Sequence, residues 1–400
     1  MGSIELEIGK PSSSLAPARA GERRLSRHSG IVAAMDPTIA SLFAPFQVKD
    51  LRLANRIVMA PMTRAHSPGG VPGADVAAYY RRRAEGGVGL IITEGTAIDH
   101  PAASSNPAVP WFHGEAALAG WARVVEAVHG AGGRIMPQLW HVGMTRKPGD
   151  LPNPEAAPVG PSGIVLKEAR RGAALAEGEI EALVQAYANG AADAARLGFD
   201  GIELHGAHGY LIDQFLHSET NVRTDRYGGG IAGRTRFAVE IVRACRERVG
   251  AGFPIVLRFS QWKLADYDAK LARTPQELEE LLAPLAEAGV DIFHCSTRRF
   301  FEPEFSGSAL NLAGWTKKIT GRPVITVGSV GLDADISTAM KGGRANATGV
   351  EAVAAMVARG EVDLVAVGRA LLVDPAWAAK IRDGRTDLIA FTPESMRTLS

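Results

Sequence analysis

The stretch AEGGVGLIITE at 84–94 contains the two features that decide the fold. It closes an amphipathic segment with two glycines and then runs into an almost continuous series of Val, Leu and Ile. Glycine supplies the left-handed residue at a helix end, and an apolar run of this length is typical of a parallel strand buried on both faces. The stretch therefore predicts a junction between a helix and a buried strand.

The same junction recurs along the chain. Near-continuous apolar runs occur at 55–60, 88–94, 134–140, 200–206, 253–260, 290–296, 322–329 and 362–369. Amphipathic segments such as Glu179–Leu197 lie between them, and Thr274 followed by Pro275 is typical of a helix start. Eight strand–helix units in one α/β chain predict a single closed (β/α)8 TIM barrel.

An open doubly wound sheet is the alternative architecture, and a missing motif weakens it. No Gly-x-Gly-x-x-Gly follows the first strand, where APMTR stands at 60–64. No break in composition marks a second domain, so residues 36–400 are predicted to form one barrel domain. Two long loops, at 141–177 and 297–313, are expected at its C-terminal face as lids or substrate walls.

Composition excludes several classes of protein. Lys and Arg total 44 and Asp and Glu total 43, so neither a general nucleic-acid binder nor a polybasic membrane-surface protein is expected. The two cysteines, Cys245 and Cys295, are too few for a disulfide framework, an all-cysteine iron–sulfur cluster or a zinc ribbon. No apolar run approaches the ~20 residues that span a bilayer.

The N-terminal segment differs from the rest of the chain. Residues 1–35 are rich in Ser, Pro, Arg and Gly without an apolar period, which predicts a disordered extension. An upstream start, with Met35 as the functional one, is the other reading. The acidic Glu5, Glu7 and Glu22 argue against a transit peptide, and a cytoplasmic location is expected.

Polar side chains stand where three consecutive predicted strands end, which is where barrel enzymes carry their chemistry. These are Gln138, His205 and Arg258, and neighbouring strands lie ~4.8 Å apart. An amide, an imidazole and a guanidinium can line a heterocycle with alternating N–H and C=O groups, and the Arg charge would stabilise a reduced flavin. The alternative is a structural ion pair between Arg258 and a rim carboxylate such as Glu94.

Glycines at the ends of the last two strands suggest an anion site. TVGSVG at 326–331 and AVGRALL at 366–372 lie where such barrels often bind phosphate, and Arg369 adds a charge. Tight-turn geometry alone is the alternative.

The segment HGAHGYLIDQFL at 205–216 carries two histidines and a tyrosine. His205 and His208 could donate together to an electron-poor oxygen, with Tyr210 as a proton donor. Satisfied rim histidines are one alternative. A metal site is another, but no third ligand is signalled and no metal is predicted.

Taken together, these segments resemble the Old Yellow Enzyme family of FMN-dependent NAD(P)H:enoate reductases, which includes the oxophytodienoate reductases. The matching pieces are LFAPFQVKDLRLANRIVMAPMTR (42–64), ITEGT (92–96), PQLWHVG (137–143), GFDGIELHGAHGYLIDQFLHSETNVRTDRYGG (198–229), LRFS (257–260) and AVGRALLVDP (366–375). They run in family order over about residues 36–385, so the resemblance implies an FMN-binding TIM barrel in 36–400.

The resemblance also implies roles for individual residues. The residues implied for the FMN ring are Pro61, Met62, Thr63, Gly95, Gln138 and Arg258, and those implied for its phosphate are Gly328, Ser329, Gly368 and Arg369. His205 and His208 would hold the activating oxygen of the substrate, and Tyr210 would protonate its α-carbon. Trp140 would shape the substrate pocket.

The implied reaction is ping-pong. NAD(P)H reduces FMN, and hydride then passes to the β-carbon of an α,β-unsaturated carbonyl compound or nitroalkene. Two segments, 261–272 and 298–301, do not match the best-known members, so the substrate range stays open. Cofactor preference between NADH and NADPH, stereochemistry and homo-oligomerisation are also left open.

Three rival functions are weighed against this reaction. A flavin-binding protein without turnover is one. A flavin-free phosphate-binding barrel lyase is another, although no predicted strand end carries the Schiff-base Lys that an aldolase needs. A larger dienoyl-CoA-reductase-like enzyme is the third, and two cysteines cannot supply its iron–sulfur cluster.

Overall fold

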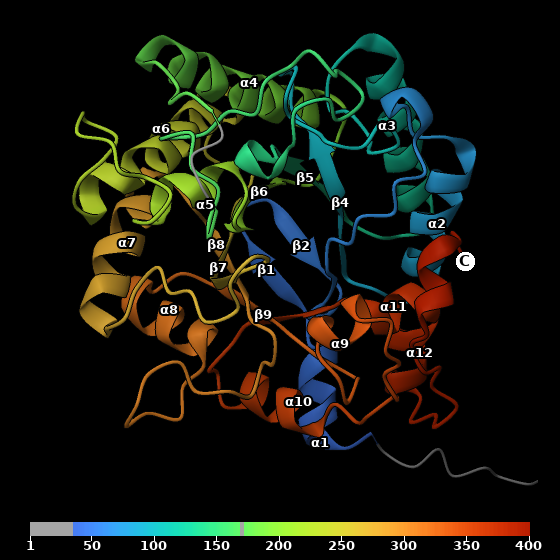
Figure 1. Ribbon diagram of the computed structural model, residues 1–400. Helices are drawn as coiled ribbons and strands as arrows, with labels where there is room; N and C mark the ends of the chain where they lie inside the picture. Colours follow the sequence, from blue (N-terminus) through green and yellow to red (C-terminus); the bar gives the residue numbers. More distant parts are fainter. Residues whose placement is uncertain (1–34, 169–171) are drawn as a thin grey trace, which may run out of the picture. The chain divides into compact units, whose positions relative to one another are not determined.

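Eight parallel strands form a closed barrel (Figure 1). Their order around the barrel is β10-β3-β4-β5-β6-β7-β8-β9. The computed structural model describes residues 35–168 and 172–400, so nearly all of the predicted extension 1–35 lies outside the described residues. The barrel strands are β3 (Ile57–Met59), β4 (Leu90–Ala97), β5 (Ile135–Trp140), β6 (Ile202–His208), β7 (Ile255–Lys263), β8 (Ile292–Ser296), β9 (Val324–Val327) and β10 (Leu364–Val367). Each overlaps one of the eight predicted runs, and the predicted (β/α)8 barrel is confirmed.

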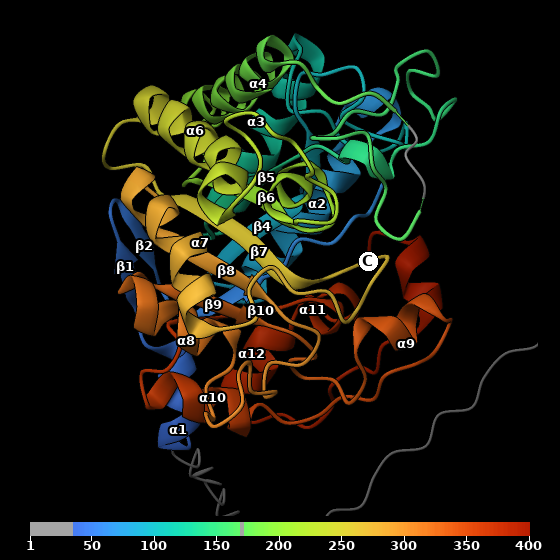
Figure 2. The same ribbon diagram turned by 60° about the vertical axis from the view of Figure 1, so that its left-hand side comes forward.

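Helices that follow the strands cover the outside of the barrel (Figure 2). The main ones are α2 (Ala74–Glu85), α3 (Glu115–Gly130), α4 (Glu177–Arg196), α6 (Ile231–Val249), α7 (Pro275–Ala288), α8 (Leu312–Thr320), α10 (Glu351–Ala358), α11 (Arg369–Val373) and α12 (Trp377–Arg382). The predicted cap of α7 is present, since Thr274 Oγ1 accepts a hydrogen bond from the Glu277 N–H at 3.2 Å. Within 35–168 and 172–400, no helix combines the length and the apolar character that crossing a membrane requires.

A short antiparallel hairpin closes the N-terminal end of the barrel. Its strands are β1 (Phe46–Val48) and β2 (Leu51–Leu53). Leu51 and Leu53 are buried against the apolar side chains that fill the barrel, among them Val58, Ile92 and Val256. The sequence analysis did not predict this hairpin, although its apolar positions alternate as a half-buried strand requires.

The opposite end of the barrel carries the longer connections (Figure 2). Short elements there and at the chain's start are α1 (Pro37–Ala40), η1 (Ser41–Phe43), η2 (Pro68–Gly70), η3 (Gly143–Thr145), α5 (Leu211–Leu216), α9 (Ile336–Met340) and η4 (Pro393–Arg397). The two predicted long loops connect β5 to α4 and β8 to α8. Both therefore follow C-terminal strand ends, as expected from the sequence.

Candidate active site

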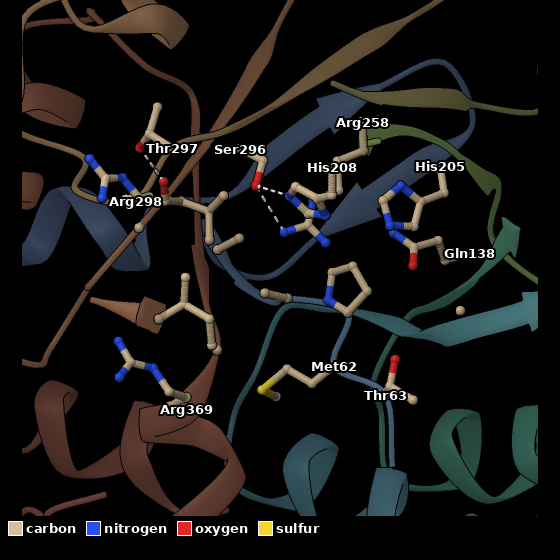
Figure 3. Close-up of a pocket in the computed structure, with 18 of the residues that line it drawn as sticks. Met62, Thr63, Gln138, His205, His208, Arg258, Ser296, Thr297, Arg298 and Arg369 are labelled. Atoms are coloured by element: carbon tan, nitrogen blue, oxygen red, sulfur yellow. Dashed lines mark hydrogen bonds between the residues drawn. The ribbon is translucent and has the colours of Figure 1, made fainter. Parts of the chain in front are cut away.

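A cavity of about 290 Å³ opens at the C-terminal ends of the barrel strands (Figure 3). Every residue that the sequence analysis singled out for flavin or substrate lines this cavity. They are Pro61, Met62, Thr63, Gly95, Gln138, Trp140, His205, His208, Tyr210, Arg258, Gly328, Ser329, Gly368 and Arg369. The structure thus brings together residues from seven of the eight strand ends, while the role of each one stays a prediction.

One side of the cavity is an edge of hydrogen-bonding side chains. Gln138 lies near the end of β5, and His205 and Arg258 are paired in register on β6 and β7. Arg258 Nη2 donates to Ser296 Oγ at 3.2 Å, whereas its Nε is buried without a hydrogen-bond partner. Arg258 therefore has donor capacity left for a ligand in the cavity.

The suggested ion pair between Arg258 and Glu94 is not formed. Glu94 Oε2 instead accepts hydrogen bonds from the backbone N–H groups of Arg64 and Ala65, at 2.8 and 2.9 Å. These bonds fix the segment that begins at Pro61. Burial raises the pKa of Glu94 to about 7, although both N–H donors act in the opposite direction.

Two buried residues that the sequence analysis missed lie beneath this edge. Gln138 Nε2 donates to Glu203 Oε1 at 2.7 Å, and Glu203 Oε2 lies 2.6 Å from His294 Nδ1. Glu203 and His294 are completely buried inside the barrel. The signal was available, because each lies two residues before a strand-end residue, His205 or Ser296, and alternate residues share one face of a strand.

The two predicted histidines lie side by side, with ring centroids 5.1 Å apart. Burial lowers the pKa of both His205 and His208 well below the usual range, and the Arg258 charge adds to the effect, so both rings are neutral at physiological pH. His205 Nδ1 accepts a hydrogen bond from the Ala207 N–H at 3.3 Å. Its proton is therefore on Nε2, which makes that nitrogen the donor.

Tyr210 meets these rings edge-on. Its ring centroid lies 5.0 Å from that of His205 and 4.9 Å from that of Trp140. Burial raises the pKa of Tyr210 to about 12. The phenol consequently keeps its proton over the whole physiological range and can serve as an acid.

The backbone that carries His208 has an unusual conformation. His208 has φ +66° and Gly209 has φ +87°, both in the left-handed region. The His208 N–H donates to Ser260 Oγ at 3.0 Å and the Gly209 N–H to Asp213 Oδ2 at 2.7 Å. Asp213 in turn forms a buried ion pair with Lys263, at 2.8 Å. Lys263 belongs to the segment 261–272, which did not match the best-known relatives.

The far end of the cavity suits an anion. Arg369 lies on the side opposite to Arg258 (Figure 3). Its Nη2 donates to the Ala334 carbonyl, and its Nη1 is buried without a partner. Gly328 has φ +138°, and a Cβ there would lie 2.6 Å from the Thr297 carbonyl oxygen, so a larger residue does not fit.

Further lining residues come from segments that carried no predicted role. Trp262 on β7 packs on His208 with ring centroids 4.5 Å apart, and Met396 lies on η4. The loop after β8 contributes Thr297 and Arg298, as expected of a wall.

The expectation for the loop 141–177 needs correction. No residue of its described part, 141–168 and 172–177, lines the main cavity. Met144, Thr145, Val165 and Leu166 instead line a neighbouring cavity of about 70 Å³ that also touches His208 and Lys263. β7 runs on to Lys263, and Trp262 and Leu264 line the main cavity.

A family model, described as the NADH:flavin oxidoreductase / NADH oxidase family, matches residues 41–387. The chain belongs to this family. Membership agrees with the resemblance to Old Yellow Enzyme, and it confirms an oxidoreductase family and FMN as the cofactor. It overturns the flavin-free lyase alternative.

Three individual proteins are similar to this family member. An NADH oxidase of Thermoanaerobacter brockii is 36% identical over 87% of this chain and 52% of its own length. The 12-oxophytodienoate reductase 7 of Oryza sativa subsp. japonica is 43% identical over 53% of this chain and 56% of its own. The chain thus spans about half the length of these relatives. A structure of morphinone reductase in complex with tetrahydroNAD is 31% identical, with TM-score 0.74, and covers 89% of this chain and 93% of that one.

The cavity fits FMN by its own chemistry. The edge formed by Gln138 and Arg258 supplies donors and acceptors for a pyrimidine ring. Arg258 and Arg369 line opposite sides of the cavity, and each has a guanidinium nitrogen without a hydrogen-bond partner among the described residues. A cationic end with close backbone approach at Gly328 suits a phosphate. Among residues 35–168 and 172–400, no three His, Cys, Asp or Glu side chains are grouped to hold a metal ion.

Proposed function

We propose that this protein is an NAD(P)H-dependent ene-reductase that acts on activated alkenes. The acceptor would be an α,β-unsaturated carbonyl compound or a nitroalkene. The observation that carries the proposal is the pair of neutral imidazoles, His205 and His208, with the Tyr210 phenol edge-on to His205 in the FMN cavity. The similarity to an oxophytodienoate reductase and to morphinone reductase supports it.

Several residues would bind the cofactor and tune it. When bound, FMN would accept hydride from NAD(P)H and pass it to the second substrate. Gln138 would hold the pyrimidine edge, and Arg258 would stabilise the negative charge that develops there. Pro61, Met62, Thr63 and Gly95 would line the ring, and Gly328, Ser329, Gly368 and Arg369 would hold the phosphate.

The histidines and Tyr210 would act on the alkene. His205 and His208 would hold its carbonyl or nitro oxygen and stabilise the negative charge that grows on it, at roughly 3–4 kcal/mol per strong donor in comparable sites. Tyr210 Oη, which keeps its proton because its pKa is about 12, would protonate the α-carbon. Trp140, whose ring contacts Tyr210, would form a wall of this site.

One cavity that serves two substrates in turn predicts ping-pong kinetics. NADH or NADPH would occupy the cavity first and leave as the oxidised dinucleotide before the alkene enters. Parallel lines in initial-rate plots are expected, and intersecting lines would contradict this order.

The test is to measure the two half-reactions separately in Tyr210→Phe. Loss of the proton donor should slow oxidation of the reduced enzyme by cyclohexenone by about 10²–10⁴-fold, whereas reduction by NAD(P)H should change little. Tyr267→Phe, outside the cavity lining, is the matched control and should leave both rates unchanged. Equal slowing of both half-reactions in Tyr210→Phe would remove Tyr210 from the proposed role.

The rival proposal, flavin binding without turnover, makes a different prediction. A yellow protein that is reduced by NAD(P)H but is not reoxidised by any activated alkene under anaerobic conditions would favour it. Cytoplasmic location and homo-oligomerisation stay predictions.

A further inference from the structure

The Ser296 hydroxyl is within hydrogen-bond distance of both His208 and Arg258 (Figure 3). Ser296 is the last residue of β8 and is buried. Its Oγ is 2.8 Å from His208 Nε2 and 3.2 Å from Arg258 Nη2. The sequence analysis gave Ser296 no role.

The direction of these two hydrogen bonds follows from donor chemistry. A guanidinium has no acceptor, so Arg258 must donate to Ser296 Oγ. The hydroxyl has one proton of its own, and the remaining partner of Oγ among the described residues is His208 Nε2. If Nε2 carried the proton instead, the hydroxyl proton would lack an acceptor among residues 35–168 and 172–400, at a cost of roughly 1–3 kcal/mol.

The His208 proton is then fixed on the other ring nitrogen. A neutral imidazole carries one proton, so a ring that accepts at Nε2 donates at Nδ1. His208 Nδ1 makes no hydrogen bond to any residue in 35–168 or 172–400, and His208 lines the main cavity. The opposite tautomer would direct a lone pair at the substrate oxygen and repel it.

We infer that Ser296 is a positioning residue that holds His208 in its Nδ1–H tautomer, so that both histidines donate to one substrate oxygen. His205 donates through Nε2, because the Ala207 N–H occupies its Nδ1. His208 donates through Nδ1, because the Ser296 hydroxyl occupies its Nε2. The inference deepens the proposed function and rests on it for the identity of the substrate oxygen.

The tautomer can be measured without turnover. Holoenzyme labelled with ¹⁵N-histidine is examined by long-range ¹H–¹⁵N correlation, which separates a protonated from an unprotonated ring nitrogen, and a His208→Asn sample assigns the signals. We expect His208 to carry its proton on Nδ1. A protonated Nε2 with a bare Nδ1 in the unsubstituted holoenzyme would overturn the inference.

Variants of Ser296 then test the cause. In Ser296→Ala the His208 signals should shift toward the Nε2–H form, whereas Ser296→Thr keeps a hydroxyl and should restore the original pattern. Thr297→Val, the matched control, removes a neighbouring hydroxyl that donates to the Val327 carbonyl and should leave the His208 signals unchanged. An unchanged tautomer in Ser296→Ala would show that another group fixes it.

The half-reactions complete the test. Ser296→Ala, checked for retained FMN by its visible spectrum, should lose about tenfold in the second-order rate of oxidation by cyclohexenone, and Ser296→Thr should recover most of it. A shifted tautomer with an unchanged rate would overturn the positioning role. If the tautomers behave as expected but no activated alkene reoxidises the enzyme, the proposed function fails while the assignment of the tautomer stands.

Discussion

The Glu203 carboxylate holds the Gln138 amide from inside the barrel, with 2.7 Å between Glu203 Oε1 and Gln138 Nε2. The carboxylate is an acceptor, so the amide nitrogen must face it. The orientation of Gln138 toward the cavity is thereby set before a ligand binds. His294 holds the other carboxylate oxygen and prevents it from turning away.

Glu203→Gln should weaken FMN binding. The substitution replaces a charged acceptor by an amide, so the Gln138 side chain loses a fixed orientation that is worth about 1.5 kcal/mol, or roughly tenfold in Kd. The measurement is a titration of the apoprotein with FMN followed by quenching of flavin fluorescence. Glu181→Gln on the exposed face of α4 is the control, and an equal Kd in both variants would contradict the positioning by Glu203.

Arg369→Gln should show whether Arg369 binds the FMN phosphate or another part of the cofactor. Loss of a charge-assisted hydrogen bond should lower FMN affinity by about 10- to 100-fold, whereas affinity for riboflavin, which has no phosphate, should not change. Arg369→Lys keeps the charge but not the planar fork, so an intermediate FMN affinity is expected. A parallel loss of riboflavin affinity would place Arg369 in a purely structural role.

Lys263→Met should destabilise the fold, and a second substitution should rescue it. The single variant leaves the Asp213 carboxylate buried and uncompensated, which removes about 3–5 kcal/mol from the free energy of unfolding. Adding Asp213→Asn removes the charge and keeps an oxygen for the Gly209 N–H, so most of the loss should be recovered. Urea unfolding of both variants measures this. Additive losses would contradict a coupled pair.

Glu94 should make stability depend on pH. Its pKa rises from 4.5 in the unfolded chain to about 7 in the folded protein, so the folded state binds the proton more tightly. The stability from this group is present below pH 4.5 and is lost as the pH rises through 7. Between about pH 5 and about pH 8, the free energy of unfolding should fall by roughly 2–3 kcal/mol relative to Glu94→Gln.

Glu94→Gln is informative because it keeps the local hydrogen bonds. A Gln oxygen can still accept from the Arg64 and Ala65 N–H groups, so only the titration is removed. Urea midpoints across the pH range give the comparison. Parallel pH profiles for the two proteins would show that Glu94 has no raised pKa.

The fold could be predicted from the sequence because its signal is local and repeated. Most buried strands are apolar runs after a glycine, as at 84–94, and the closed order of the strands follows from the number of units. The hairpin β1–β2 escaped prediction because three-residue strands carry too few positions for a period to stand out.

The candidate site was predictable only where a residue stands at a strand end. Gln138, His205 and Arg258 stand near the ends of the predicted apolar runs and line the cavity, although β7 continues beyond Arg258 to Lys263. Glu203 and His294 lie two residues earlier on the same strand faces, so their spacing marks them as inward-facing, but the contact between them is seen only in the structure. The position of Trp262 depends on how far β7 extends, which no local pattern specifies.

The hairpin β1–β2 stabilises the barrel at one end, and the cavity lies at the other end. Leu51 and Leu53 pack into the barrel at the end remote from the cavity. Substitutions at the two ends of the barrel should therefore have different effects on stability. Segments such as 261–272 and 298–301 can diverge in sequence, whereas the apolar side chains packed against the hairpin keep the strands in register. Directed evolution of substrate selectivity should accordingly succeed with substitutions in 261–272 and 298–301 and fail with substitutions at Leu51 and Leu53.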